Sequence, residues 1–263
     1  MKKPKGDYAI QAVVNAIRLL ETFRDEEEQG VTPLAKRLDL HKNNVFRLLA
    51  TLEQLGYIEQ CAKSDRYRLG VRSLELGQSF GRSRNLLQRG RQILDELVET
   101  CGESTHIGLL RDLQVVHVEG RSPERLVMTG TRVGLALPAH CTALGKVLLG
   151  CAPTAVRESF DRKVVAGGNL PMITPATICD PAKFFEHLRT VAVRGFALDL
   201  EECEPGLSCA AAPVFDAEGQ LVAAISVSGP SFRLPEERLI DEIVPLVVAS
   251  ADQLSRELGF TTG

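Results

Sequence analysis

The spacing of apolar residues changes near residue 103, and this change constrains the fold more than any other feature of the chain. Up to that point, apolar residues recur every three or four positions, as they do on amphipathic helices. From Ser104 they alternate with polar residues, which is typical of strands, over 104–111, 114–119 and 125–129. A purely helical or purely β chain is excluded. The sequence therefore predicts an α+β chain, in which a helical N-terminal part precedes a domain with a mainly antiparallel sheet.

The first sixty residues contain three predicted helices. The first covers 9–23, and its apolar stripe is expected to face a core. The second covers 33–38, with Thr32 as N-cap and Pro33 as its first residue. The third begins after Leu40 and ends at Gly56, which suits the position just beyond a helix. Three helices with a tight turn between the last two predict a helix-turn-helix. The stripe of the first helix consists of Ile10, Val13, Val14, Ile17 and Leu20.

A short hairpin follows the third helix. Residues 57–61 and 66–70 have strand character and are separated by a polar turn, which predicts a wing. The outward face of the third helix is polar and can both donate and accept hydrogen bonds, as contact with base edges in a major groove requires. The wing is basic, which suits a phosphate backbone. An ordinary amphipathic surface helix is the alternative. The residues expected to contact operator DNA are Thr32, Lys42, Asn43, Asn44, Arg47, Thr51, Lys63, Arg66 and Arg68.

The charge is distributed unevenly along the chain. The net charge of −3 combines a positive front, with 17 Lys/Arg against 11 Asp/Glu over residues 1–94, and a negative remainder, with 14 against 23. These parts carry +6 and −9. A basic module joined to an acidic one favours nucleic-acid binding by the front. Since no secretory or membrane-spanning segment is evident, we expect a cytoplasmic protein without membrane contact.

The second part of the chain alternates between helical and strand patterns. Predicted helices cover 140–149, 153–160, 181–193 and 235–258, and further strands cover 196–199, 208–215 and 221–228. A glycine within a helical pattern marks a hinge near Gly81. We therefore expect a winged helix-turn-helix domain over 1–80, a linker helix over 81–102 and a larger domain over 103–263.

Several stretches resemble the IclR family of transcriptional regulators. The run Val31–Gly70, from VTPLAKRL to YRLG, resembles its winged-helix signature, although Asn43 and Asn44 stand where that family often has small hydroxyl residues. The stretches Arg132–Leu149, Arg194–Gly219 and Gln220–Pro230 resemble its effector domain. The resemblance implies a GAF-like domain that binds a small metabolite, often a carboxylate, and a homodimer or tetramer on DNA. It places the effector contacts on Ala143, Leu144, Asp199, Leu207, Cys209, Ser226 and Ser228.

The residues themselves are compatible with that pocket. Ser226 and Ser228 are two positions apart in a predicted strand, so their hydroxyls share a face and can contact an anion. The alternative is that they bond only to neighbouring backbone. Asp199 can accept a hydrogen bond from a ligand hydroxyl or amine. Leu144 is larger than the residue found in relatives that bind very small acids, so it either narrows the cavity or turns away from it.

Three other functions are compatible with parts of the sequence. A cysteine enzyme would use Cys141 or Cys209, with a base among His106, His117, His140 and His187, but no catalytic motif accompanies them. A metal-dependent protein would use Cys203, Cys209 and a histidine, at a spacing unusual for zinc. A DNA-binding protein without a ligand is the third. The seven scattered cysteines include no CxxC pair, which disfavours a disulfide framework. We expect a non-enzymatic regulator without metal or cofactor.

Overall fold

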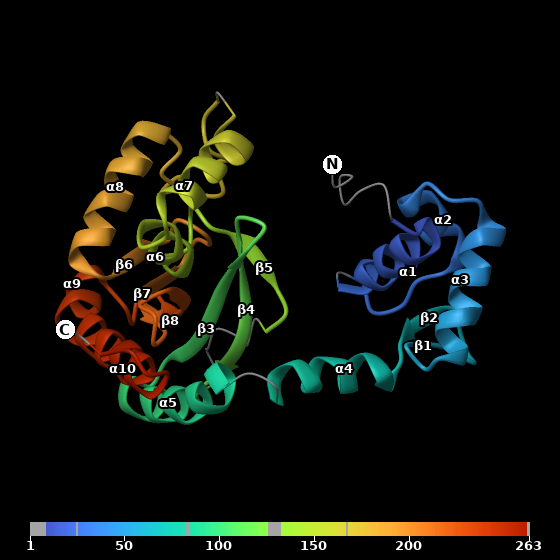
Figure 1. Cartoon of the computed structure of the whole chain (residues 1–263), viewed down its shortest axis with the longest axis horizontal. Helices are drawn as coiled ribbons and strands as arrows, with labels where there is room; N and C mark the ends of the chain where they lie inside the picture. The colour runs from blue at the N-terminus through green and yellow to red at the C-terminus, as the bar shows by residue number, and fades with distance from the viewer. Residues whose placement is uncertain (1–8, 25, 83–84, 126–132, 167, 262–263) are drawn as a thin grey trace. The chain divides into compact units, whose positions relative to one another are not determined.

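The computed structural model describes residues 9–24, 26–82, 85–125, 133–166 and 168–261 of the 263-residue chain. Side chains are described over the same ranges, except those of 78–82. The chain divides into two compact units after Ser83, and each is considered by itself (Figure 1). Residues 81–102, expected as a linker helix, include the end of α4 and the whole of α5. Gly81, the expected hinge, lies within α4.

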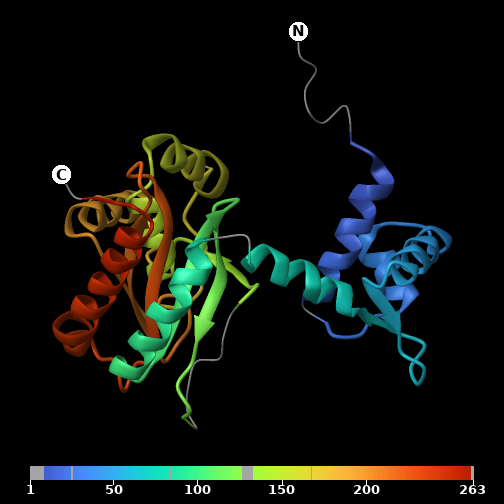
Figure 2. The same cartoon turned by 60° about the horizontal axis from the view of Figure 1, so that its bottom comes forward.

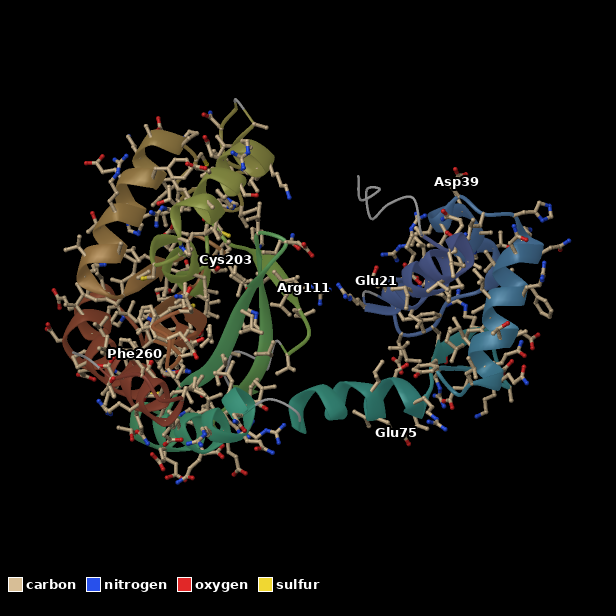
Figure 3. The ribbon with its side chains drawn as sticks, viewed as in Figure 1. Glu21, Asp39, Glu75, Arg111, Cys203 and Phe260 are labelled. Carbon is tan, nitrogen blue, oxygen red and sulfur yellow. The ribbon has the colours of Figure 1, made fainter. Side chains whose placement is uncertain are left out.

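The first unit is a helix-turn-helix followed by a hairpin, as predicted. Its elements are α1 (Gln11–Glu21), the 3-10 turn η2 (Thr22–Arg24), α2 (Val31–Leu38), α3 (Lys42–Gln54), β1 (Ile58–Gln60), β2 (Tyr67–Leu69) and α4 (Val71–Arg82). Asp39 adopts a left-handed conformation that ends α2 and turns the chain toward α3 (Figure 3). Gly56 has φ +77°, which confirms its predicted place after α3.

Two details of this unit differ from expectation. The helix α2 begins at Val31 with Gly30 as N-cap, so Thr32 lies inside the first turn. Pro33 is still tolerated there because the first-turn amides have no partner within the helix. The predicted core stripe of α1 is wrong for most of its residues. Ile10, Val13 and Ile17 are 67%, 56% and 52% exposed, and α1 reaches the core instead through Leu19, with Leu20 packed against it.

The second unit is a sheet of six strands in the order β5-β4-β3-β8-β7-β6, in which every described pairing is antiparallel. The strands are β3 (Ser104–Arg111), β4 (Gln114–Arg121), β5 (Ala136–Pro138), β6 (Ala197–Leu200), β7 (Leu207–Phe215) and β8 (Leu221–Pro230). The predicted antiparallel sheet is thus confirmed. The short β5 was missed, and the predicted strand 125–129 lies almost wholly outside the described residues.

Helices cover both faces of this sheet (Figures 1 and 2). On one face lie α5 (Asn85–Cys101) and α10 (Val244–Glu257), and on the other lie α6 (Ala143–Gly150), α7 (Thr154–Phe160) and α8 (Pro181–Arg194). Successive side chains of β7 point to opposite faces of the sheet. Ala210 packs in the core beneath α5 and α10, whereas Cys209 and Ala211 pack in the core beneath α6, α7 and α8. The sheet therefore has an apolar core on each of its faces.

The last predicted helix, 235–258, is not continuous. It consists of α9 (Glu236–Arg238), a π-helical turn η4 (Leu239–Ile243) and α10. Pro245 explains the interruption, because proline has no N–H for the carbonyl four residues earlier and its ring collides with that carbonyl. A similar π-helical turn, η3 (Asp161–Val165), follows α7.

Candidate functional site

The exposed face of α3 carries most of the residues expected to contact DNA. Lys42, Asn43, Asn44, Arg47 and Thr51 are all exposed. The Thr51 hydroxyl donates to the Arg47 carbonyl at 2.8 Å, so this hydroxyl is partly engaged within the helix. At the start of α3, the His41 ring accepts a hydrogen bond from the backbone N–H of Asn43 at 3.3 Å, which caps the helix. The helix thus presents a polar face whose backbone is anchored at its N-terminus.

Sequence reasoning missed Phe46, which lies on α3 and is 56% exposed. A large apolar ring in that position is unusual for a solvated helix, and an apolar side chain in a major groove can contact a thymine methyl group. Phe46 belongs neither to the core stripe of α3 nor to its polar face, so neither pattern indicated a role for it. The available signal was an aromatic residue that lies between Lys42 and Asn43 on the helical wheel.

The wing is also exposed at Lys63, Arg66 and Arg68. Its two strands pair between Ile58–Gln60 and Tyr67–Leu69, as the hairpin prediction required. The Arg68 guanidinium donates to Glu59 at 2.6 Å, and this contact raises the pKa of Arg68. Part of the positive charge expected at the wing is therefore balanced by a neighbouring carboxylate, whereas Lys63 lies at the exposed tip. Thr32 is exposed in the first turn of α2.

A buried pocket lies above the sheet of the second unit, beside the start of α6. All seven residues that the resemblance assigned to the effector line it, which brings together positions from α6, β6, β7 and β8. Five further residues line it that were not among the expected effector contacts: His106, His117, Leu137, Thr142 and Cys203. The free volume is about 20 Å³, close to the space of one water molecule. The pocket is therefore nearly closed in this conformation.

Strand register explains why these residues meet. Asp199 lies opposite Cys209, and Cys209 lies opposite Ser228, so one rung of the sheet carries a carboxyl, a thiol and a hydroxyl. Residues on one rung point to the same face. On the next rung of the pocket face, Ser226 lies opposite His106 of β3. The predicted shared face of Ser226 and Ser228 is therefore confirmed.

The start of α6 forms the roof of the pocket. The Thr142 hydroxyl caps the helix by accepting from the Gly145 amide at 3.1 Å. A side chain at Gly145 would overlap the Ala139 carbonyl, so a glycine is needed for the helix to approach this closely. Leu144 lines the pocket and does not turn away from it. It packs over Gly108, where a Cβ would lie 2.9 Å from its nearest methyl.

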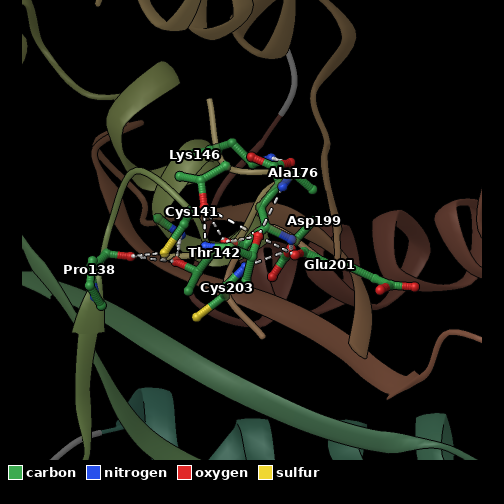
Figure 4. A network of polar contacts seen from close by, with 12 residues as sticks. Pro138, Cys141, Thr142, Lys146, Ala176, Asp199, Glu201 and Cys203 are labelled. Atoms are coloured by element: carbon green, nitrogen blue, oxygen red, sulfur yellow. Dashed lines mark hydrogen bonds and ion pairs between the residues drawn. The ribbon is translucent and has the colours of Figure 1, made fainter. Parts of the chain in front are cut away.

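Asp199 is the acidic group of the pocket and is 1% exposed. One of its oxygens accepts hydrogen bonds from the amides of Glu202 and Cys203, at 2.8 and 3.3 Å (Figure 4). Burial raises the pKa of Asp199 to about 7, although Lys146 acts in the opposite direction. This carboxyl can thus be protonated or ionised near neutral pH, and it can donate or accept a hydrogen bond accordingly.

A buried ion pair with α6 holds the loop after Asp199. Lys146, which has no exposed surface, contacts the Glu202 carboxylate. Burial raises the pKa of Glu202 despite this partner. Two threonine hydroxyls add hydrogen bonds to the loop backbone: Thr174 donates to Glu201 at 2.6 Å, and Thr177 donates to Glu202 at 2.7 Å. The position of Asp199 and Cys203 in the pocket wall therefore depends on contacts outside the pocket.

The cysteine and metal alternatives gain no support from this geometry. A hydrogen bond with the Cys203 thiol, together with burial, raises the pKa of Cys141 far above its ordinary value. A nucleophilic thiol requires the opposite shift. The His140 ring contacts the Pro171 carbonyl at 2.8 Å, and burial lowers the pKa of His187 to about 4. Within the described ranges, no group of three or more His, Cys, Asp or Glu side chains is arranged to hold a metal ion.

The whole chain has counterparts among known proteins. The model of the IclR helix-turn-helix domain matches residues 12–61, and that of the bacterial transcriptional regulator IclR C-terminal matches residues 78–256. The chain is 35% identical over 257 residues to the glycerol operon regulatory protein of Streptomyces coelicolor, which covers 95% of this chain and 97% of that one. It is 32% identical over 252 residues to the HTH-type transcriptional regulator XynR of Escherichia coli, with 95% and 98% coverage.

A solved structure has the same fold. It is an IclR homologue from Microbacterium hydrocarbonoxydans complexed with 4-hydroxybenzoate, with a TM-score of 0.80 at 24% identity over 94% of this chain and 98% of that one. Among the described helices, none combines the length and apolar character needed to span a membrane. The family matches extend over both units, and the relatives are matched along nearly their full length. This chain therefore belongs to the IclR family of DNA-binding transcriptional regulators.

Proposed function

We propose that α3 and the wing bind operator DNA and that a small organic acid, bound in the pocket beside α6, changes the affinity of that binding. The observation that carries the proposal is the convergence of seven separate sequence positions on one buried pocket. They come from four elements spread over 86 positions, from Ala143 to Ser228, and strand register aligns those that lie on the sheet. Ordinary core packing would not select hydroxyl, thiol and carboxyl groups for such a place, because polar groups are costly to bury.

The DNA-binding role rests on the first unit. Its recognition helix exposes an arginine and two asparagines, side chains whose geometry matches guanine and adenine edges respectively. Lys63 and Arg66 extend from the wing, where they suit phosphates. We assign Arg47 as a principal contact because it lies in the middle of the exposed face of α3. Thr32 and Lys42, at the starts of their helices, are assigned to the backbone of the duplex.

The effector role rests on the hydrogen-bond donors of the pocket. Ser226 and Ser228 direct hydroxyls to one face, and the first turn of α6 adds backbone amides with the positive end of the helix dipole. Such a group of donors suits a carboxylate. A relative of the same fold holds 4-hydroxybenzoate, which is an organic acid. Because the pocket has a free volume of only about 20 Å³, the acid is small or the pocket widens to admit it.

We further propose that the protein is a homodimer and that two dimers bind one operator as a tetramer. One short helix contacts only a few base pairs, so paired half-sites are needed for useful specificity. The exposed stripe on α1 supplies a surface for this contact: Ile10, Val13 and Ile17 are each more than half exposed and share one side of the helix. On α4, Val71 and Leu74 are exposed as well.

The proposal is tested with Ser226→Ala/Ser228→Ala in the full-length protein. The parent should gain thermal stability when 4-hydroxybenzoate or short carboxylic acids are added, and the acid that binds should shift operator affinity about 5 to 150 fold, the effect of a coupling of about 1–3 kcal/mol. The double variant should lose both responses and retain ligand-free DNA binding. Ser208→Ala is the matched control, because Ser208 is equally buried on β7 but is not part of the pocket wall. An unchanged response of the double variant would contradict the proposal.

A further inference from the structure

The pocket contains two imidazoles that were not among the expected effector contacts. His106 comes from β3 and His117 from β4, and both line the same cavity as the serines. They are 1% and 5% exposed, and their rings meet edge to face with centroids 5.2 Å apart. Two buried imidazoles in contact form a polar part of the cavity wall on β3 and β4, next to the hydroxyl groups of β8.

The backbone around the rings makes room for them. At Gly120, which lies opposite His106, a Cβ would be 2.9 Å from the nearest ring carbon. His117 lies opposite Gly108, next to an irregularity in the pairing of β3 with β4. Glycine therefore stands across the strand pair from each histidine. The absence of a side chain at Gly120 leaves room for the His106 ring, and both rings line the cavity beside Leu144.

The polar side chains of the pocket come from different strands of the sheet. The imidazoles occupy β3 and β4, the serine hydroxyls β8, and the Asp199 carboxyl the far strand β6. Neighbouring strands are about 4.8 Å apart, so Asp199 lies three strand spacings, or about 14 Å along the sheet, from His106. The nearby Glu202 carboxylate is paired with Lys146. An anionic group near the imidazoles is therefore remote from the acidic end of the pocket.

We propose that His106 and His117 bind a second carboxylate of the effector, so that the pocket selects a short dicarboxylic acid. The first carboxylate lies against Ser226, Ser228 and the start of α6, as in the proposed function on which this inference rests. An imidazole retains at least one N–H donor in every protonation state found in proteins, whereas a carboxylate offers only acceptors. Hydrogen bonds of this kind gain strength where water is excluded, as it is here.

The spacing of the two donor groups indicates the length of the ligand. His106 is directly opposite Ser226 and diagonal to Ser228, which places the side-chain origins about 5 and 7–8 Å apart. Because the side chains converge on the cavity, a chain of roughly three to five carbons is long enough to bridge the two groups. A monocarboxylic acid of the same length would leave the imidazoles without this acceptor.

The test compares acids of equal chain length with the full-length protein. Titration calorimetry would measure malonate against propionate and succinate against butyrate, for the parent and for His106→Gln/His117→Gln. We expect the parent to bind at least one dicarboxylate about tenfold or more tightly than its partner acid, and we expect the double variant to reduce that preference to less than about threefold. His187→Gln is the matched control, because His187 is a histidine of the same unit that is not part of the pocket wall.

The outcomes separate this inference from the proposed function. If both acids of a pair bind equally and binding depends on Ser226 and Ser228, the assignment of the imidazoles is wrong and the effector pocket stands. A preference that persists in the double variant also overturns the assignment. If none of the four acids binds the parent, the dicarboxylate inference fails; if 4-hydroxybenzoate also gives no response, the proposed effector role fails with it. Should the double variant not fold, His117→Gln alone replaces it, with a smaller but measurable loss of preference expected.

Discussion

The two units differ in how their functional residues are brought together. On α3, Asn43, Asn44 and Arg47 share a face because they are close in sequence, and one helical turn sets their positions. In the pocket, Asp199, Cys209 and Ser228 meet only because β6, β7 and β8 pair in a particular order and register. A helix surface is thus a local property of the sequence, whereas a pocket on a sheet is a property of its topology. Substitutions should act accordingly, on binding alone in the first case and on binding together with stability in the second.

The largest effect is expected from the buried ion pair between Lys146 and Glu202. Lys146→Ala leaves the Glu202 carboxylate buried without its cation, and such a change lowers the free energy of unfolding by about 3–5 kcal/mol. Urea denaturation of the full-length protein, followed by far-UV circular dichroism, would measure it. Lys183→Ala is the control, because Lys183 is exposed on α8 and should change the stability little. Equal stability of the two variants would show that the pocket wall does not depend on this pair.

A smaller effect is expected on the exposed helix, and it should affect binding only. Arg47→Ala removes a side chain from the outward face of α3, so operator affinity should fall by about 1–3 kcal/mol while the melting temperature stays within about 1 °C of the parent. Fluorescence anisotropy with operator DNA would measure the affinity. Arg111→Ala removes the same charge from an exposed position at the end of β3 in the other unit (Figure 3). If the two variants bind DNA equally, the recognition face is misplaced.

The difference between the units also limits what the sequence predicted. Periodicity located α3, the wing and most strands, because each is a repeating local pattern. It did not place His106 and His117 in the pocket, since their meeting with Ser226 depends on β3 pairing with β8, more than one hundred residues later. Periodicity also predicted that the apolar stripe of α1 faces the core of this unit. An apolar stripe indicates a contact surface but not the partner that covers it, and Ile10 and Ile17 remain exposed within this chain. The seven effector positions were named from the resemblance, and the structure shows only that they meet.

The acidic residue of the pocket should make the second unit sensitive to pH. Burial raises the pKa of Asp199 to about 7, above the value of an unfolded aspartate, so the folded state holds a proton that the unfolded state has lost. The stability that this group contributes is therefore full at acidic pH and is lost as the pH rises toward 7, by about 1 kcal/mol per pH unit between pH 5 and 7. Asp199→Asn keeps an acceptor for the Glu202 amide and removes the titration. Unfolding measured at pH 5, 6 and 7 should therefore show a smaller loss of stability for the variant, and parallel curves would contradict the assignment.

The smallest effect concerns α1. The helix itself was predicted correctly, but its apolar stripe does not face the core of this unit. If the stripe of Ile10, Val13 and Ile17 is covered by a second copy, Ile17→Ser removes apolar contact from both subunits at about 1 kcal/mol each. The dimer should then dissociate more readily, by about fivefold for each lost contact, and the free energy of unfolding of the separate chain should stay almost unchanged because this side chain is already 52% exposed. Sedimentation equilibrium over a concentration series would measure the dissociation. Val193→Ser is the matched control, since Val193 is 90% exposed on α8 and belongs to no proposed contact. Equal dissociation of the two variants would place the dimer contact elsewhere, whereas a selective effect of Ile17→Ser would show that the apolar pattern of α1 predicts an interface between chains.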